Sequence, residues 1–223
     1  MEHLPIYIYL TFGATAILGI WLFFKATQYS KPFLFGLLGW IAVQSTLAIA
    51  GFYNNTLTTT ARFPLLVIPP ILLLVSLFIT KNGRAFLDSL DLPTLTIFHM
   101  IRIPVELVLF WLFVRGAVPE AMTFHGRNLD ILSGISAPVI YYFGFIKKTL
   151  NNPVMIGWNL ICLALLLNVV STAILSLPAR FTQFGFGQPN IALGYFPFVL
   201  LPAVLVPLVM FATVAGIKQL LKK

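Results

Sequence analysis

The sequence predicts an all-α protein that crosses a membrane several times, and three observations support this fold class. Hydrophobic residues make up 59% of the 223-residue chain, charged residues make up only 9%, and the mean hydropathy is +0.96. A soluble domain carries roughly 25% charged residues. The apolar residues gather in long runs, without the short alternating segments that are typical of a membrane β-barrel. We therefore expect a single helical transmembrane domain over residues 1–223.

Seven apolar runs are long enough to cross a hydrocarbon core of about 30 Å, which takes roughly 17–25 helical residues. Helices are expected because backbone groups that face lipid must form hydrogen bonds within their own segment. The predicted transmembrane helices cover residues 6–25, 33–53, 63–80, 94–115, 129–146, 154–177 and 191–220. Between the third and fourth helices, Phe86, Leu87 and Leu90 have near-helical spacing, which predicts a short helix at the membrane surface.

Apart from Arg102, the basic residues lie in or beside the short connectors and predict the orientation of the chain. Nine of them are on one side of the predicted helices, namely Lys25, Lys31, Lys81, Arg84, Lys147, Lys148, Lys218, Lys222 and Lys223. Four are on the other side, namely Arg62, Arg115, Arg127 and Arg180. The side with more basic residues is expected to face the cytoplasm. The N-terminus is then outside and the C-terminus cytoplasmic, and we expect a multi-pass protein of a bacterial inner membrane.

Matching strings predict an internal repeat. Residues 63–69 and 196–202 share the pattern F-P-x-x-x-x-P, and the second and sixth helices both contain Gly-Trp after a proline. The matches occur in the same order along the chain. They predict two parallel three-helix units, residues 1–80 and 129–223, joined by the helix at 94–115; in transporters built from repeats the substrate site lies at the repeat interface. Chance matches between apolar segments are the alternative.

In this layout the chain resembles the SWEET sugar-transporter and PQ-loop group, which has seven helices, an outside N-terminus and two triplets joined by a fourth helix. The resemblance is one of topology. That group carries Pro-Gln in the first helix of each triplet, whereas the first helix here has no internal proline and Pro138 in the fifth is followed by Val139. No binding residue is therefore carried over from it.

The fourth predicted helix contains the main candidate site. His99, Arg102 and Glu106 are spaced i, i+3 and i+7, which places them on one face. An ionisable group near the middle of a bilayer costs at least ~2.5–3.5 kcal/mol on insertion scales, so such groups indicate a functional site. Pro104 removes the usual hydrogen-bond partner of the Met100 carbonyl and predicts a bend.

Two interpretations of this stripe are open. Arg102 and Glu106 are four residues apart, so they predict either a structural ion pair or a polar site for an anionic or hydroxylated group with a proton or cation at Glu106. His99 is a proton relay or a histidine hydrogen-bonded within the bundle. Other polar residues predicted at mid-membrane, which could complete the site, are Gln44, Asn168, Ser136, Tyr141 and Tyr142.

A second polar group is predicted at the outer mouth of the bundle. It consists of Glu120, His125, Arg127 and Asp130, and its spacing matches no familiar metal-binding pattern. Solvated loop residues, or a cap by Asp130 on the fifth helix, are the expected roles. Arg127 could instead bind a lipid phosphate.

Our leading functional hypothesis is a proton-coupled transporter or permease for a small molecule or ion, with Arg102 and Glu106 in its site. The first alternative is a membrane-embedded enzyme acting on a lipid or isoprenoid, with Glu106 as general acid or base. The second is a ligand-sensing or scaffold protein in which the pair is structural. The expected partners are the lipid bilayer, the substrate and, in a homo-oligomer, a second copy of the chain.

Several functions are excluded by what the sequence lacks. Retinal binding needs a lysine in mid-membrane, and every lysine lies at the edge of the membrane that is predicted to be cytoplasmic. No HExxH, GxSxG, P-loop or GxGxxG string is present. The basic residues form no single patch, so no nucleic acid is expected as a partner, and we expect neither a cofactor nor a metal.

Overall fold

The computed structural model describes residues 4–53, 62–179 and 182–222, and every regular element in these ranges is helical. The expected all-helical fold is thus confirmed. The α-helices are α1 (Ile6–Ala26), α2 (Lys31–Ile49), α4 (Pro64–Ile79), α5 (Lys81–Ser89), α6 (Leu92–Phe98), α7 (Arg102–Val114), α8 (Ile131–Tyr141), α9 (Asn152–Leu175) and α10 (Val206–Lys222). Two π-helical segments, Tyr142–Ile146 and Leu201–Leu205, extend α8 and precede α10.

Five continuous helical stretches are long and apolar enough to cross a membrane. They are Ile6–Ala26, Lys31–Ile49, Leu92–Val114, Asn152–Leu175 and Leu201–Lys222. A sixth crossing is obtained if α4 and α5 count as one span, although they are bent by 98°. The stretch Ile131–Ile146 is apolar but shorter. The described chain is therefore that of a multi-pass membrane protein with five or six helices of spanning length.

Most predicted boundaries agree with the observed helices to within a few residues, but the start of the last one is wrong. The prediction places it at residue 191, whereas the helix begins at Leu201. The intervening residues form a 3₁₀ turn at Ala192–Gly194 followed by further turns. Hydropathy alone does not separate these apolar turn residues from a helix.

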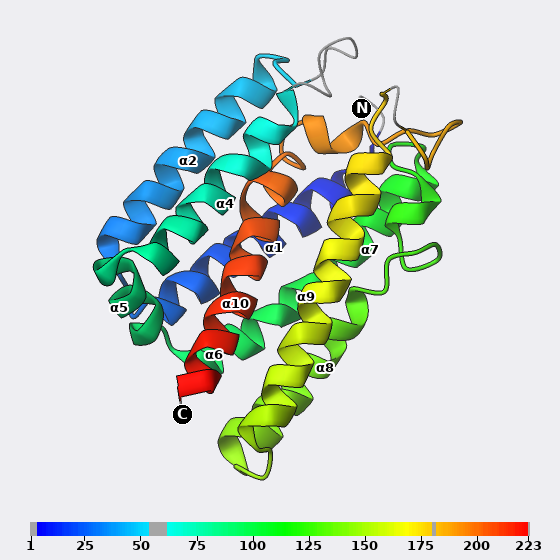
Figure 1. Ribbon diagram of the computed structural model, residues 1–223. Helices are drawn as coiled ribbons and strands as arrows, with labels where there is room; N and C mark the ends of the chain where they lie inside the picture. The colour runs from blue at the N-terminus through cyan, green and yellow to red at the C-terminus, as the bar shows by residue number, and fades with distance from the viewer. Residues whose placement is uncertain (1–3, 54–61, 180–181, 223) are drawn as a thin grey trace.

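The helices form a bundle in which α10 is central (Figure 1). It packs against α9 and α6, while α1 packs against α6 and α7. Aromatic side chains fill the interior between α1, α6 and α10, where the Phe23 ring lies against the rings of Phe98 and Phe211. The described ends of the chain lie at opposite ends of the bundle (Figure 1).

The predicted surface helix at residues 81–93 is present as α5. Thr80 caps it by accepting a hydrogen bond from the Gly83 N–H, and Leu87 is buried. Asp88 forms ion pairs with Lys218 and Lys222 of α10, and these hydrogen bonds hold the pKa of the Asp88 carboxyl below its ordinary value. The α5 helix therefore connects the end of α4 to the end of α10.

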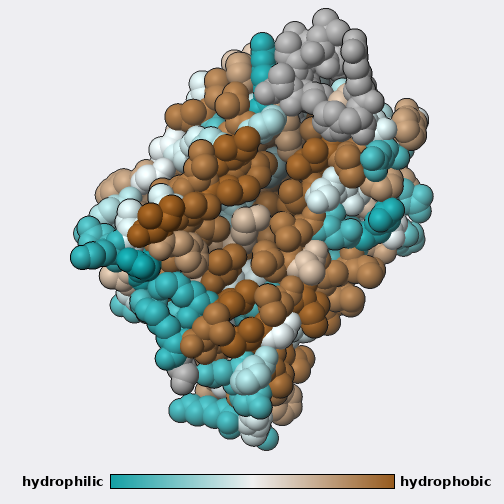
Figure 2. Space-filling model, in the orientation of Figure 1, coloured by the Kyte–Doolittle hydropathy of each residue, from teal (hydrophilic) through white to brown (hydrophobic). Residues whose placement is uncertain are grey.

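The outer surface of the bundle is apolar where α2 and α4 face outward (Figure 2). Only Gln44 and Ala48 of α2 are buried, and leucine and isoleucine side chains of both helices are exposed. Surfaces of this kind are typical of contact with lipid.

The internal repeat remains a prediction. Its two matching strings have different local structures, because Pro64 begins α4 while Phe196 and Pro197 lie in turns before the π-helical segment that contains Pro202.

Candidate functional site

The residues of the predicted stripe lie on the span formed by α6 and α7. A 3₁₀ turn at His99–Ile101 separates the two helices, and Pro104 lies in the first turn of α7, where its missing N–H costs no helical hydrogen bond. The sequence predicts a bend at Pro104, and the structure has the 3₁₀ turn at His99–Ile101 just before it. His99, Arg102 and Glu106 are all buried, with 1–2% of each residue's surface exposed.

The ionic partner of Arg102 is Asp130, not Glu106. The Arg102 Nη1 forms an ion pair with Asp130 Oδ1 and also donates a hydrogen bond to the Cys162 carbonyl at 3.2 Å. The predicted pair of Arg102 and Glu106 is therefore wrong. Although i, i+4 spacing allows such a pair within one helix, the guanidinium instead joins α7 to the start of α8 and to α9.

Glu106 is held by the side-chain amide of Asn128. The Asn128 Nδ2 donates to both carboxyl oxygens of Glu106 at 2.7 Å and to the Met122 carbonyl at 3.0 Å. The Asn128 Oδ1 in turn accepts from the Asp130 N–H at 3.0 Å, an Asx turn that fixes the start of α8. Asn128 thereby links the two carboxyl-bearing residues Glu106 and Asp130.

These side chains form a buried polar cluster, defined here as Arg102, Glu106, Asn128, Asp130 and Ser133. Each of the five is at most 4% exposed, and Ser133 donates to Asp130 at 3.4 Å. The cluster holds two carboxyl groups and one guanidinium. Within the described residues, Glu106 forms no salt bridge.

A small cavity of about 40 Å³ adjoins the polar cluster. Arg102, Glu106 and Asp130 line it together with apolar residues of α7, α9 and α10. The buried Nε and Nη2 atoms of Arg102 have no hydrogen-bond partner among the described residues. A cavity of this size has room for about two or three water molecules, and most of its wall is apolar.

His99 is one turn away from the polar cluster and does not join it. Its ring lies edge-on to the Trp158 ring at 5.2 Å between centroids, and its buried Nδ1 has no partner among the described residues. Trp158 donates to Ser136 at 2.9 Å. The predicted relay from His99 to Glu106 has no direct contact in this structure.

The other predicted mid-membrane residues do not surround Glu106. Gln44 accepts a hydrogen bond from Tyr53 at 2.6 Å, and Asn168 donates to the Arg127 carbonyl at 2.8 Å. Tyr141 and Tyr142 lie at the far end of α8, where the Lys147 ammonium is 5.7 Å from the Tyr142 ring. The expected polar chamber is therefore replaced by the five-residue cluster.

The predicted outer-mouth group also separates. Glu120, His125 and Arg127 are exposed, with the His125 ring 5.0 Å from the Phe110 ring and the Arg127 guanidinium 4.9 Å from the Phe184 ring. Asp130, expected in this solvated group, is buried instead because it neutralises Arg102. Within the described ranges, no three His, Cys, Asp or Glu residues are grouped to hold a metal.

No protein-family model, no curated protein and no solved structure matches the chain. The function is therefore argued from the polar cluster and its surroundings.

Two members of the cluster are not evident from the sequence. Asn128 and Ser133 lie at the edge of α8, where polar residues are common and carry little information. The signal that could have found Asn128 is its position two residues before Asp130, because Asn at that spacing forms an Asx turn.

Proposed function

We propose that the protein is a transporter of protons or of another small ion, with its site at the polar cluster. The observation that supports this most directly is a buried group of two carboxyls and one guanidinium beside a cavity of about 40 Å³. Ionisable groups inside a transmembrane bundle are costly and are typical of ion pathways and proton relays.

The charges of the cluster suggest separate roles for its two carboxyl groups. Asp130 neutralises Arg102, whereas Glu106 accepts hydrogen bonds only from the neutral Asn128 amide among the described residues. Glu106 is thus the group whose charge is free to change, by binding a proton or cation. Because the Asp130 N–H donates to the Asn128 side chain, such a change at Glu106 would also affect the start of α8.

The size of the cavity favours an ion over a larger substrate. Sites for drug-sized molecules usually occupy about 300–1,000 Å³. The cavity at the polar cluster is far smaller at about 40 Å³. The helices around Arg102 would have to separate to admit a small-molecule substrate. A proton, a water or a small ion would not require this.

The alternative of a lipid-modifying enzyme has less support. A second cavity, of about 560 Å³, is lined by apolar residues together with Ser30, and none of its lining residues is an acid, a base or a thiol. This cavity shares no lining residue with the smaller cavity at the polar cluster.

The transporter hypothesis includes a seven-crossing topology, with the N-terminus outside and the C-terminus in the cytoplasm. The lysine-rich connectors support it. In a Cys162→Ser background, we expect a membrane-impermeant maleimide to label Glu120→Cys in intact cells, and to label Ser89→Cys only after permeabilisation. Both replaced side chains are exposed. Labelling of the two positions in the opposite order would contradict this orientation.

The proposed function is tested by measuring proton flux through the protein and its dependence on Glu106. Purified protein in liposomes with an internal pH-sensitive dye is given a proton gradient and a potassium diffusion potential. We expect wild-type protein to dissipate the gradient and Glu106→Gln to reduce the rate at least tenfold, because the amide cannot carry the charge change.

The matched control is Glu120→Gln, which removes an exposed carboxyl outside the cluster and should leave the rate unchanged. Circular dichroism and gel filtration show whether each variant is folded. An undiminished rate in folded Glu106→Gln would overturn the role of Glu106, and no gradient dissipation by wild-type protein would overturn proton transport.

A further inference from the structure

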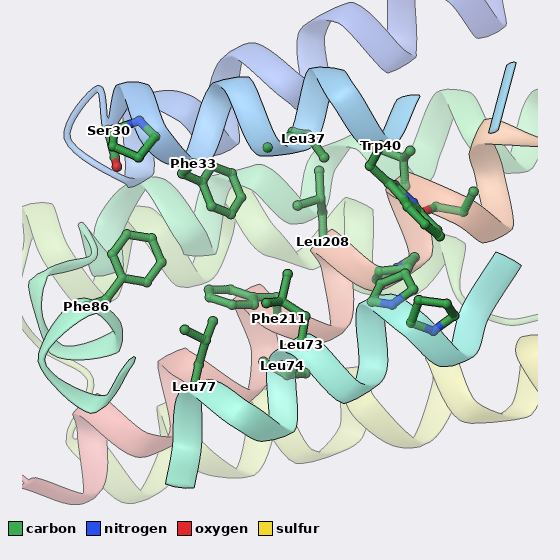
Figure 3. A pocket seen from close by; sticks show the side chains of 17 residues that line it. Ser30, Phe33, Leu37, Trp40, Leu73, Leu74, Leu77, Phe86, Leu208 and Phe211 are labelled. Carbon is green, nitrogen blue, oxygen red and sulfur yellow. The ribbon is translucent and has the colours of Figure 1, made fainter. Parts of the chain in front are cut away.

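The 560 Å³ cavity is an open groove on the outside of the bundle, away from the polar cluster. One wall is α2, the other is α4, and α10 with the preceding π-helical segment forms the floor (Figure 3). Phe33, Leu37 and Trp40 of α2 point into it opposite Leu73 and Leu77 of α4 (Figure 3). The groove exists because α2 buries few residues against the rest of the protein.

The lining of the groove offers almost no polar group to a ligand along most of its length. Its lining is apolar apart from Ser30 at one end and the indole of Trp40 at the other. The Trp40 Nε1 already donates to the Ala203 carbonyl at 2.8 Å. An occupant that lies between these two residues is therefore expected to present an apolar surface.

The length of the groove corresponds to one leaflet of a bilayer. Ser30 and Trp40 bound it, and their separation of ten positions along a helix corresponds to about 15 Å. A bilayer has a hydrocarbon core of about 30 Å, so one leaflet contributes about half of that. A single extended acyl chain fits this length.

The end of the groove at Ser30 is basic. Lys31 is between two lining residues, and the exposed side chains of Lys25, Lys81 and Arg84 belong to the adjoining ends of α1 and α5. None of the four forms a salt bridge among the described residues. Hydrophilic residues gather over α5 at this end (Figure 2). Exposed cations at the membrane surface attract anionic headgroups.

We propose that the groove between α2 and α4 binds one acyl chain of an anionic phospholipid, with the phosphate near Lys31. The chain enters from the leaflet on the lysine-rich side and ends near Trp40. This site is separate from the ion site, so a failure of either proposal leaves the other standing.

The test uses the fluorescence of Trp40 as a probe inside the groove. A variant that keeps only this tryptophan, with Trp21, Trp111 and Trp158 changed to Phe, is placed in phosphatidylcholine liposomes. Brominated-chain phosphatidylglycerol or brominated-chain phosphatidylcholine is added at the same mole fraction. We expect at least twofold stronger quenching by the anionic lipid. Native mass spectrometry of wild-type protein should also show one retained phosphatidylglycerol, which keeps the test valid if the single-tryptophan variant fails to fold.

Two glycines of α2 provide a matched pair of variants. A side chain added at Gly36, which lines the groove, or at Gly39, which does not, would meet no atom within 4 Å. Gly36→Leu should therefore fill the groove and abolish the excess quenching, and Gly39→Leu should keep it. Lys31→Gln should reduce the preference for the anionic lipid.

Three results would overturn the proposal. These are equal quenching by the two lipids together with no retained phosphatidylglycerol, the same loss in both glycine variants, and a disulfide between two copies of Gly36→Cys in a Cys162→Ser background. The last result would show that a second copy of the chain occupies the groove.

Discussion

Asp130→Asn is expected to lower the free energy of unfolding by about 3–5 kcal/mol, because it leaves the buried Arg102 guanidinium without its counter-charge. Removing one partner of a buried pair costs far more than the pair itself contributes. The measurement is reversible unfolding of the purified protein in mixed micelles, followed by circular dichroism. The expected loss is large because Arg102 and Asp130 join α7, α8 and, through the Cys162 carbonyl, α9.

Two controls separate this effect from a general loss of charge. Asp88→Asn removes a partly exposed carboxylate of α5 that pairs with lysines at the end of α10, so it should change stability by less than about 1 kcal/mol. Replacing both partners, with Arg102→Met and Asp130→Leu, should recover most of the loss since no buried charge remains. If Asp130→Asn is as stable as Asp88→Asn, Arg102 is not held by Asp130.

Gly134→Leu is expected to destabilise the protein by about 3 kcal/mol or more and to reduce ion flux. A Cβ at Gly134 would lie 2.8 Å from Ile103 Cγ1 and 3.1 Å from the Ile103 nitrogen, so a leucine cannot fit between α7 and α8. Small residues allow membrane helices to approach this closely. Overpacking alone costs about 1–3 kcal/mol, and separating the helices also pulls Asp130 away from Arg102.

The control for this prediction is Gly157→Leu in α9. A side chain at Gly157 would meet no atom within 4 Å, and both substitutions give the same gain in helix propensity. Unfolding in micelles and the proton-flux assay are applied to both variants. Equal stability of Gly134→Leu and Gly157→Leu would show that the close contact at Ile103 is not needed.

The position of most helices is predictable from the sequence, since hydropathy marks any run that must lie in lipid. The composition likewise predicts a multi-pass protein, because 9% charged residues is far below the share that a soluble domain carries. Hydropathy fails at residues 191–200, where apolar side chains such as Phe198 and Val199 are buried in turns and not in a helix. An apolar residue therefore predicts that the position is buried, but it does not predict a helix.

The partners within the site are not predictable in the same way. His99, Arg102 and Glu106 stand out because charges in an apolar run are rare, and all three are buried. Their contacts depend on side chains that approach from α8 and the preceding connector, and sequence spacing within one helix carries no information about these. Because Asp130 lies next to a predicted connector, the sequence suggests that it is solvated. The fold of residues 116–130 instead buries both Asp130 and Asn128.

The short stretch Ile131–Ile146 has a consequence for the membrane itself. At 1.5 Å per residue, its helical residues extend about 24 Å, which is less than the hydrocarbon thickness of about 30 Å. In the proposed seven-crossing arrangement, local thinning of the bilayer beside α8 would relieve this hydrophobic mismatch. Headgroups and water from the outer leaflet would then lie closer to Asn128 and Asp130, so the lipids themselves would shorten the path between bulk solvent and the buried charges.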